Sequence, residues 1–498
     1  MKSKLLLLFL LIAAIAFFQF CHDEQSFKSQ ASKDGFELAK KNCATCHQLP
    51  KPNAVDKQTW ANYVLPKMSG YFGFNYMQGG SYFENGKHAE TMPLNEWRKI
   101  LTYYISEAPE TLEPKKIGQH VKMGLPFFSV DTSAFHIATP VTTFARAAKQ
   151  HGQLIFADGQ TEQVYKLSRS LQLVDSIAIG TGVVHVRSTE SATWYLSMGV
   201  LYPSDESAGK LVIKEKGSKM THTILDSLQR PVHIEYADLD GDRLEDIILC
   251  EFGNTAGKFS WLKNTGNNTY QQKVLRGLPG AIRSEVIDAD SDGLLDLVVL
   301  MAQGDEGIFI YYNKGNGNFQ EQRVLQFSPS FGSNYFELAD VNNDGFPDVL
   351  ATNGDNGDYP AILKPYHGIR IYMNDGKYNF KESIFLPVNG SSKAIARDFD
   401  RDGDLDIASI AYFPDYDNTP QESFIYWENK GDLKFSPYSF SQATAGRWLT
   451  LEADDIDDDG DLDIVLGNAK FSFGYVPKSL MKKWVQYAPS VLILRNNQ

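Results

Sequence analysis

Five acidic segments of one design recur in the second half of the chain and constrain its fold more than any other feature. They begin at residues 238, 288, 340, 398 and 455, so the copies are 50, 52, 58 and 57 residues apart. Each segment lies between two runs that read as strands, and each repeat then closes with an aromatic strand, a turn rich in Asn and Gly, and a short strand. Four strands in a repeat of about 50 residues predict one blade of a β-propeller.

The acidic segments share a pattern that fits a bound cation. Oxygen-bearing side chains occupy positions 1, 3, 5 and 9 of every copy, and four of the five copies have glycine at position 6. Side chains on alternate residues of a tight turn converge, so the pattern predicts a cage for a hard cation such as Ca²⁺. It is not an EF-hand, because position 12 is never Glu and a strand follows. We expect up to five structural Ca²⁺ ions, and the candidate ligands are Asp238, Asp240, Asp242, Asp246, Asp288, Asp290, Asp292, Asp296, Asp340, Asn342, Asp344, Asp348, Asp398, Asp400, Asp402, Asp406, Asp455, Asp457, Asp459 and Asp463.

The acidity of the chain follows largely from these segments. Its net charge of −13 argues against a nucleic-acid partner, which would require a basic surface. Five Ca²⁺ ions would offset ten of these negative charges. Most of the acidity would then balance bound ions rather than attract a charged partner. The alternative is that some copies are acidic turns without an ion, and the first copy, with Arg243 in place of the glycine, is the weakest candidate.

These repeats resemble the FG-GAP/VCBS family, which forms the propeller of integrin α-subunits and of many exported bacterial proteins. The resemblance is strong over 230–498 and extends weakly to 139–229, where blade-like strand pairs lack the acidic segment. It implies an all-β propeller over 139–498, with five clear blades and two degenerate ones, seven in total. We expect a strand from 121–145 to close the ring by pairing with the last blade.

The strand before each acidic segment alternates between apolar and polar side chains. Positions −4 and −2, counted back from the first Asp, are mostly apolar, and positions −5 and −3 are mostly polar. Alternation places the polar set on one face, which lines the central channel if this strand is the innermost of its blade. That face is either a solvated wall with ion pairs or a substrate or docking site at the channel mouth. The candidates are His233, Glu235, Arg283, Glu285, Tyr335, Glu337, Lys393 and Glu452.

Residues 1–20 predict an export signal, because Lys2 and Lys4 precede the apolar run LLLLFLLIAAIAFF. Cys21 follows at the place of a lipoprotein cysteine, and we favour lipidation there. Cleavage at the A-x-A pattern of residues 14–16 and retention as a short anchor are the alternatives. Each of the three places the chain outside the cytoplasm, in the periplasm or on the outer membrane or cell surface. A lipid anchor would then be its membrane contact.

The segment CATCH at residues 43–47 is the C-x-x-C-H pattern of covalent c-type haem. Cys43 and Cys46 would bind the two vinyl groups, and His47 would be an axial ligand of the iron. A thioredoxin-like redox pair or a zinc half-site is less consistent, because the sequence lacks the surroundings that either requires. Residues 33–115 therefore look like a small all-α, class I-type cytochrome c domain, after a linker over 21–32.

Two methionines compete for the sixth position of such a haem. Met92 precedes Pro93 well downstream of the histidine, which is the general arrangement in these domains. Met68 ends a W-x-x-x-V-L-P-x-M pattern similar to that of haem domains attached to repeat-rich exported proteins. The resemblance slightly favours Met68. Thioether ligation would raise the reduction potential and suit electron transfer.

The sequence as a whole predicts a multidomain protein: a cytochrome c domain, a segment 116–138 that links it to the propeller and begins the closure, and the propeller. We favour an exported electron-transfer protein whose calcium-stabilised propeller is a scaffold and binding surface for a redox partner, a surface protein or a glycan. The alternative is a quinoprotein sugar or alcohol dehydrogenase that passes electrons to its fused cytochrome. The sequence shows no cofactor motif for that enzyme and no catalytic residue that we could name.

Overall fold

The computed structural model of the chain describes residues 26–77, 79–84, 92–148, 152–357, 362–470 and 474–498. They form two compact units. The first runs to Cys43 and continues over Lys51–Thr111, and the second comprises Leu112–Gln498, with Ala44–Pro50 grouped with it. The export signal and Cys21 lie outside the described residues, so both remain predictions.

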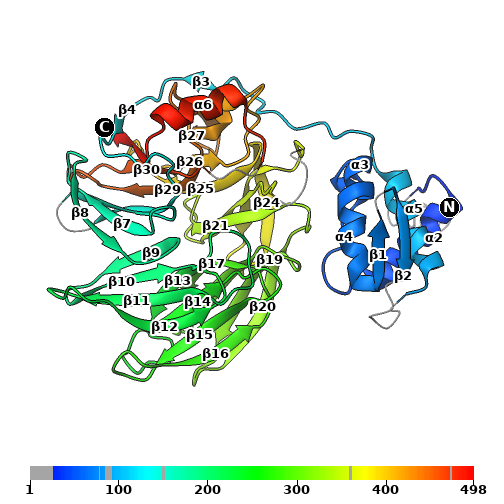
Figure 1. Cartoon of the computed structure of the whole chain (residues 1–498), viewed down its shortest axis with the longest axis horizontal. Coiled ribbons are helices and arrows are strands. Elements are labelled where there is room, and N and C mark those ends of the chain that lie inside the picture. Colours follow the sequence, from blue (N-terminus) through cyan, green and yellow to red (C-terminus); the bar gives the residue numbers. More distant parts are fainter. Residues whose placement is uncertain (1–25, 78, 85–91, 149–151, 358–361, 471–473) are drawn as a thin grey trace, which may run out of the picture. The chain divides into compact units, whose positions relative to one another are not determined.

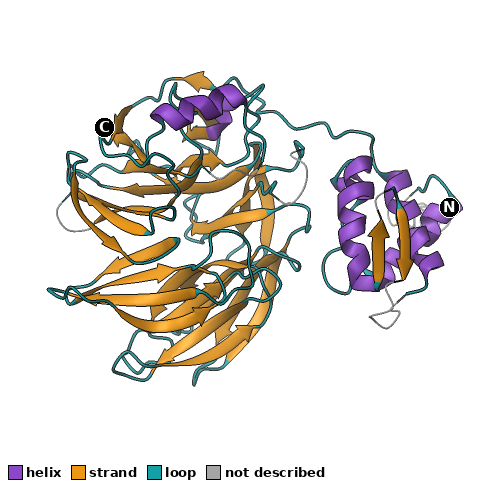
Figure 2. Cartoon of the chain, in the orientation of Figure 1, coloured by secondary structure: helices purple, strands orange, loops and turns teal. Residues whose placement is uncertain are grey.

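The N-terminal unit is mainly helical (Figure 2). Its elements are α2 (Gln30–Asn42), η1 (Pro52–Ala54), α3 (Lys57–Thr59), the π-helix η2 (Trp60–Val64), α4 (Leu65–Ser69), η3 (Gly70–Phe72), β1 (Phe74–Met77), β2 (Ser81–Glu84) and α5 (Leu94–Glu107). The antiparallel pair of β1 and β2 departs from an all-α unit. Gly79 and Gly80 both adopt positive φ between these strands, a conformation that suits a tight turn.

Helices α2 and α5 pack against each other and form the core of this unit. The ring centroids of Phe36 and Tyr103 are 5.4 Å apart. Helix α5 buries Trp97, Ile100, Tyr103 and Tyr104, whereas its amphipathic pattern predicts Leu101 on the buried face. Tyr103 is buried because α2 covers a second side of the helix.

The C-terminal unit contains seven sheets within the described residues, and they follow one another in chain order (Figure 1). The strands of the first three sheets are β5 (Thr142–Ala148), β6 (Gln153–Asp158), β7 (Gln163–Leu167), β8 (Leu173–Ala178); β9 (Val183–Ser188), β10 (Ala192–Ser197), β11 (Gly209–Glu215), β12 (His222–Leu228); β13 (Pro231–Ala237), β14 (Asp246–Glu251), β15 (Lys258–Asn264) and β16 (Tyr270–Arg276). Those of the next two are β17 (Ala281–Ile287), β18 (Asp296–Met301), β19 (Gly307–Asn313), β20 (Phe319–Gln326); β21 (Ser333–Ala339), β22 (Asp348–Asn353), β23 (Gly368–Asn374) and β24 (Phe380–Pro387).

The last two sheets draw strands from both ends of this unit. Their strands are β25 (Ser391–Arg397), β26 (Asp406–Ala411), β27 (Phe424–Asn429), β28 (Phe435–Ser439) with β3 (Lys122–Met123); and β29 (Trp448–Asp454), β30 (Asp463–Asn468), β31 (Val491–Asn496) with β4 (Phe128–Thr132). β4 pairs antiparallel with β31, from Phe128 opposite Asn496 to Thr132 opposite Leu492. A strand from 121–145 therefore closes the ring by completing the last blade, as the sequence predicts.

The first strand of each sheet contacts the first strand of the next, and β29 contacts β5 to complete the circle. The unit is therefore a seven-bladed β-propeller with β5, β9, β13, β17, β21, β25 and β29 innermost. Side chains of adjacent sheets fill the spaces between blades. Leu297 and Val299 of the fourth blade, for example, pack with Ile248 and Trp261 of the third.

One insertion in the last blade, between β30 and β31, contains helix α6 (Lys478–Tyr487). Its Trp484 packs with Tyr416 from the β26–β27 connection. In the part of the chain that the structure describes, no helix is long and apolar enough to cross a membrane.

Candidate functional site

The C-x-x-C-H segment begins where helix α2 ends. Cys43 caps the helix with its N–H donated to the carbonyl of Ala39, and its side chain is buried, whereas Cys46 is exposed. Nδ1 of His47 lies 2.8 Å from the carbonyl oxygen of Gln48. A carbonyl can only accept, so Nδ1 carries the proton and Nε2 is the ring atom with a lone pair for a metal. The carbonyl that orients the ring is that of Gln48, the next residue in the chain.

A buried donor without a partner among the described residues lies on helix α5 of the N-terminal unit. Trp97 is 1% exposed, and its indole Nε1–H has no hydrogen-bond partner among the described residues. The rings of Phe72, Phe74 and Tyr82 lie within 6 Å of the Trp97 ring, at 5.5, 5.9 and 5.8 Å between centroids. Buried donors are nearly always satisfied. The Trp97 indole therefore lies in an aromatic shell with its donor unpaired among the described residues.

The two candidate axial methionines lie in different environments. Met92, just before α5, is 2% exposed and belongs to the core. Met68 lies in the short helix α4 and is half-buried. Met77 is 57% exposed at the end of β1. These environments do not choose between Met68 and Met92, and both remain candidates.

The five acidic segments form the turns between the first and second strands of blades three to seven. The first Asp of each turn accepts backbone hydrogen bonds from the middle of the same turn. In the second copy, Asp288 accepts from the N–H groups of Asp292 and Gly293, both at 3.1 Å. In the last copy, Asp455 accepts from Asp459 at 3.2 Å and Gly460 at 2.9 Å. These bonds draw the chain into a loop whose carboxylates face inward.

Four of the five turns gather three carboxylates that could hold one cation. One oxygen from each member lies within 4.8 Å of the others in the sets Asp238/Asp240/Asp246, Asp288/Asp290/Asp296, Asp398/Asp400/Asp402 and Asp455/Asp457/Asp459. Oδ1 of Asp398 and Oδ1 of Asp457 are buried without a hydrogen-bond partner among the described residues. A buried carboxylate oxygen is costly unless it is paired. These turns could therefore hold Ca²⁺.

The surroundings of the carboxylates differ between copies. In the third copy, Nδ2 of Asn342 donates to Asp344 at 2.8 Å, and no three-carboxylate set forms there among the described residues. In the first copy, the Lys263 amine contacts Asp240 and lies 3.2 Å from Asp242. A side-chain cation thus lies beside the carboxylates of the first copy, and Lys314 likewise lies 2.8 Å from Asp290 of the second.

The Asp at position 9 has a second function in every copy. Asp246, Asp296, Asp348, Asp406 and Asp463 are all 0% exposed. In the fourth blade, Asp296 accepts from the N–H of Ala289 at 2.9 Å and from that of Asn313, at the end of the third strand, at 2.7 Å. The same pair of bonds recurs at Asp246, Asp348 and Asp463. This residue therefore joins the turn to the neighbouring hairpin of its blade.

The polar side chains of the inner strands contact the inner strand of the following blade: His233 Nδ1 accepts from the N–H of Ser284 at 3.3 Å, and Glu285 accepts from the N–H of Leu338 at 3.3 Å. The basic and acidic side chains are paired there. Arg283 lies 3.2 Å from Glu285 of the same strand, and Arg397 lies 3.2 Å from Glu337 of the preceding blade. Lys393 lies 2.6 Å from Glu452, which is on the inner strand of the next blade. The guanidinium of Arg283 lies 4.6 Å from the centroid of the Tyr335 ring, and the amine of Lys393 lies 4.9 Å from it. The arrangement matches the expectation of a wall of ion pairs.

Burial dominates the titration of this wall. It raises the pKa of Glu285 to about 7, with Arg283 opposing the shift. It holds the pKa of His233 well below its ordinary value, and the nearby Arg283 and His185 act in the same direction. His233 is therefore neutral near pH 7, and its 3.5 Å contact with Glu235 is not an ion pair. Glu452, in contrast, has a lowered pKa because Lys393 and Arg283 outweigh its burial.

Sequence reasoning missed the contribution of the two degenerate blades to this channel. Their inner strands place Arg146 and Arg187 at the position that is Glu in four other blades, and His185 at the position of His233. Arg146 lies 3.5 Å from Asp454 of the last blade. Burial, Arg146 and Arg187 lower the pKa of His185 to about 4. The inner strands of the other five blades are identified by the acidic segment that follows them, and the first two blades have no such segment.

Comparison with known proteins supports the repeats. The family model of the FG-GAP-like repeat matches residues 238–299, 288–351 and 398–466. No curated protein matches the sequence.

Several solved structures share part of the chain trace at very low identity. The BBS1N structure in complex with ARL6DN is 10% identical, with 76% of this chain and 98% of that chain covered and a TM-score of 0.45. Sqt1 of Saccharomyces cerevisiae is 9% identical, with 74% and 99% covered and a TM-score of 0.44. The calcium-binding protein regucalcin of Agrobacterium tumefaciens is 8% identical, with 76% and 96% covered and a TM-score of 0.37.

Proposed function

We propose that this chain is an exported electron-transfer protein with haem c in residues 33–115 and a calcium-stabilised propeller that serves as scaffold and binding surface. The FG-GAP-like repeats and the carboxylate sets of the propeller fit the scaffold and binding role. The bound partner would be a redox protein, a surface protein or a glycan.

The observation that supports the haem most directly is the hydrogen bond from Nδ1 of His47 to the Gln48 carbonyl, next to Cys43 and Cys46. An axial histidine of a metal usually donates its other ring N–H to a backbone or carboxylate oxygen, which orients the ring and raises its basicity. Cys43 and Cys46 would form the two thioether bonds. Met68 or Met92 would supply the sixth ligand. When bound, haem supplies one-electron chemistry.

The test is expression of the chain together with a cytochrome c maturation system. We expect a covalent haem that survives denaturation and acid precipitation. Cys43→Ser or Cys46→Ser should each remove one thioether bond, which the position of the haem α-band reports, and His47→Ala should abolish low-spin haem. Cys250→Ala is the matched control, because Cys250 is a buried core residue of the third blade. A matured chain without covalent haem would refute the electron-transfer proposal.

The axial methionine can be identified in the same preparation. Met68→Ala and Met92→Ala should differ, since only the true ligand removes the sulfur-to-iron charge-transfer band of the oxidised protein. Loss of the band in neither variant would exclude both residues. Mass spectrometry of the mature N-terminus would test export, and a diacylated Cys21 as first residue is the expected result.

A further inference from the structure

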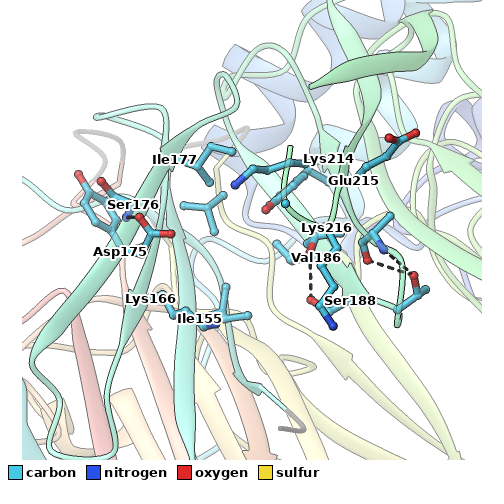
Figure 3. Close-up of a pocket in the computed structure, with 17 residues that line it drawn as sticks. Ile155, Lys166, Asp175, Ser176, Ile177, Val186, Ser188, Lys214, Glu215 and Lys216 are labelled. Atoms are coloured by element: carbon cyan, nitrogen blue, oxygen red, sulfur yellow. Dashed lines mark hydrogen bonds between the residues drawn. The ribbon is translucent and has the colours of Figure 1, made fainter. Parts of the chain in front are cut away.

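A cavity of about 330 Å³ lies between the first and second blades. Figure 3 shows its two walls, with Lys166, Asp175 and Ile177 on the first blade and Val186, Ser188 and Lys214 on the second. None of the channel residues or acidic-turn residues described above lines it. Cavities of this size accommodate small ligands.

Strand register shows which side chains face this cavity. Paired residues on adjacent strands point to the same face of a sheet. Lys166 pairs with Ile155 and with Asp175, so these three share one face of the first blade. On the second blade, Thr193 pairs with Ser188 and with Lys214 and shares their face. Two lysines thus project from opposite walls into one space.

The other blades reveal what normally occupies the Lys214 position. The residue there pairs with the second-strand residue that corresponds to Thr193, and it faces the preceding blade. Its equivalents are Leu167, Leu262, Tyr311, Tyr372, Trp427 and Leu494. All six are apolar or aromatic and at most 6% exposed. They fill the space between blades.

The Lys166 position faces the following blade and shows the same contrast. Its equivalents in the other blades are Ile213, Trp261, Ile310, Ile371, Tyr426 and Ile493. All are at most 6% exposed. The interface between blades one and two is therefore the one place in the described ring where both filling residues are lysines, and the cavity opens there.

The chemistry of the cavity is that of a site for an anion with hydroxyl groups. Neither Lys166 nor Lys214 forms an ion pair with another described residue. Ser188 and Thr193 place hydroxyls 3.4 Å apart on the second wall. Ile155, Ile177 and Val186 supply an apolar floor. Both amines are half-buried, and the Asp175 carboxylate also lines the cavity on the Lys166 side. An anion placed between the two lysines would gain charge-assisted hydrogen bonds from both walls.

We propose that the cavity between blades one and two binds an anionic monosaccharide, with its carboxylate or phosphate between Lys166 and Lys214 and its ring over Ile155, Ile177 and Val186. Ser188 and Thr193 would bind the ring hydroxyls. The proposal deepens the glycan-binding role of the propeller and rests on it, but it requires neither haem nor Ca²⁺.

Calorimetric titration of the full chain tests this with four probes: glucuronate, glucose 6-phosphate, glucose and inorganic phosphate. We expect one or both charged sugars to bind. Glucose should bind at least about tenfold more weakly because it lacks the charge-assisted hydrogen bonds to the lysines, and inorganic phosphate at least about tenfold more weakly because it lacks the contacts of the sugar ring. Binding of glucuronate alone assigns a carboxylate ligand, and binding of glucose 6-phosphate alone a phosphate ester. Equal binding of glucose would overturn the role of the lysines, and equal binding of inorganic phosphate would overturn the role of the sugar ring. No binding of either charged sugar would overturn the proposal, while the haem spectrum and calcium-dependent melting would be unaffected.

Variants that restore the pattern of the other blades give a second readout. Lys214→Leu reproduces Leu262 of the third blade, and Lys166→Ile reproduces Ile310 of the fourth. We expect each to abolish binding and to raise the melting temperature, because an apolar residue fills the space. Lys214→Gln keeps the size of the side chain and should weaken binding without that gain. Lys381→Gln, on the exposed edge strand β24, is the matched control. Unchanged affinity in Lys214→Gln and Lys166→Gln would contradict the proposal.

Discussion

A Cβ atom on Gly35 would lie 2.0 Å from the carbonyl oxygen of Lys99, so helices α2 and α5 approach more closely here than any side chain allows. Helix α2 carries the C-x-x-C-H segment at its end, and α5 carries Trp97. The contact between these two residues therefore fixes how closely the two main helices of this unit pack.

Gly35→Ala should destabilise the N-terminal unit by about 2 kcal/mol or more, because the added methyl meets backbone rather than a flexible side chain. Chemical denaturation followed by the fluorescence of Trp60 and Trp97 in this unit would measure the change. Gly70→Ala is the control, since a Cβ there meets nothing within 4 Å. Equal stability of the two variants would contradict the close helix contact.

Removal of Ca²⁺ should lower the melting temperature of the propeller. A ligand at 1,000 times its dissociation constant stabilises the folded state by about 4 kcal/mol per site. We expect EDTA to shift the melting transition downward and Asp398→Asn to reduce that shift, because Asp398 contributes to the carboxylate set of the fourth acidic turn. Asp432→Asn, at a side chain that is 87% exposed, should leave the shift unchanged. A melting curve insensitive to EDTA would exclude structural calcium.

Arg243→Gly should stabilise the chain by about 1 kcal/mol, since Arg243 has φ of 71° and a non-glycine residue is strained in the left-handed region. The other four turns have glycine at this position, with φ from 86° to 95°. Thermal denaturation in the presence of Ca²⁺ would measure the gain. Arg243→Ala retains the strain and separates the backbone effect from the loss of the guanidinium.

Glu306 should make stability depend on pH. Burial raises its pKa to about 8, although Ser333 donates to it through both N–H and Oγ, at 3.3 and 2.8 Å. Between its ordinary pKa of 4.5 and about 8, the folded state binds more protons than the unfolded state, so the free energy of unfolding falls as pH rises through this range. Glu306→Gln should remove this contribution and flatten the profile measured by urea denaturation. Glu190→Gln, at an exposed position, should reproduce the parent slope.

Much of the propeller is predictable from the sequence because each repeat has a short, recognisable pattern within it. The turn, the alternating inner strand and the aromatic third strand all follow from side-chain period and glycine placement, which act within one blade. The prediction of a closing strand from 121–145 also held, since β4 completes the last blade. The polar residues of the inner strands are predictable only in blades that contain the acidic segment. The sequence does not predict Arg146, His185 and Arg187, because the first two blades lack a segment that would identify the register of their inner strands.

The glycine at position 6 illustrates the same limit on a smaller scale. The turns contain two left-handed residues, at positions 4 and 6, and the first copy places glycine at position 4 and Arg243 at position 6. The sequence alone shows only that Arg243 replaces the glycine found at position 6 of the other four copies. The backbone shows that the second left-handed position is Gly241 in that copy and Ser291, Asn343, Arg401 and Asp458 in the others.

The sequence by itself determined the repeat length, the number of acidic turns, the polar face of each inner strand and the C-x-x-C-H motif, because each depends on residues close together in the chain. The tertiary structure alone decided which side chains meet: the pairing of Lys393 with Glu452, the role of the position-9 Asp between two hairpins, and the two lysines that face one cavity. Those contacts join residues that are 17 to 59 positions apart in the chain. Their energies depend on burial and distance, which exist only once the blades have packed.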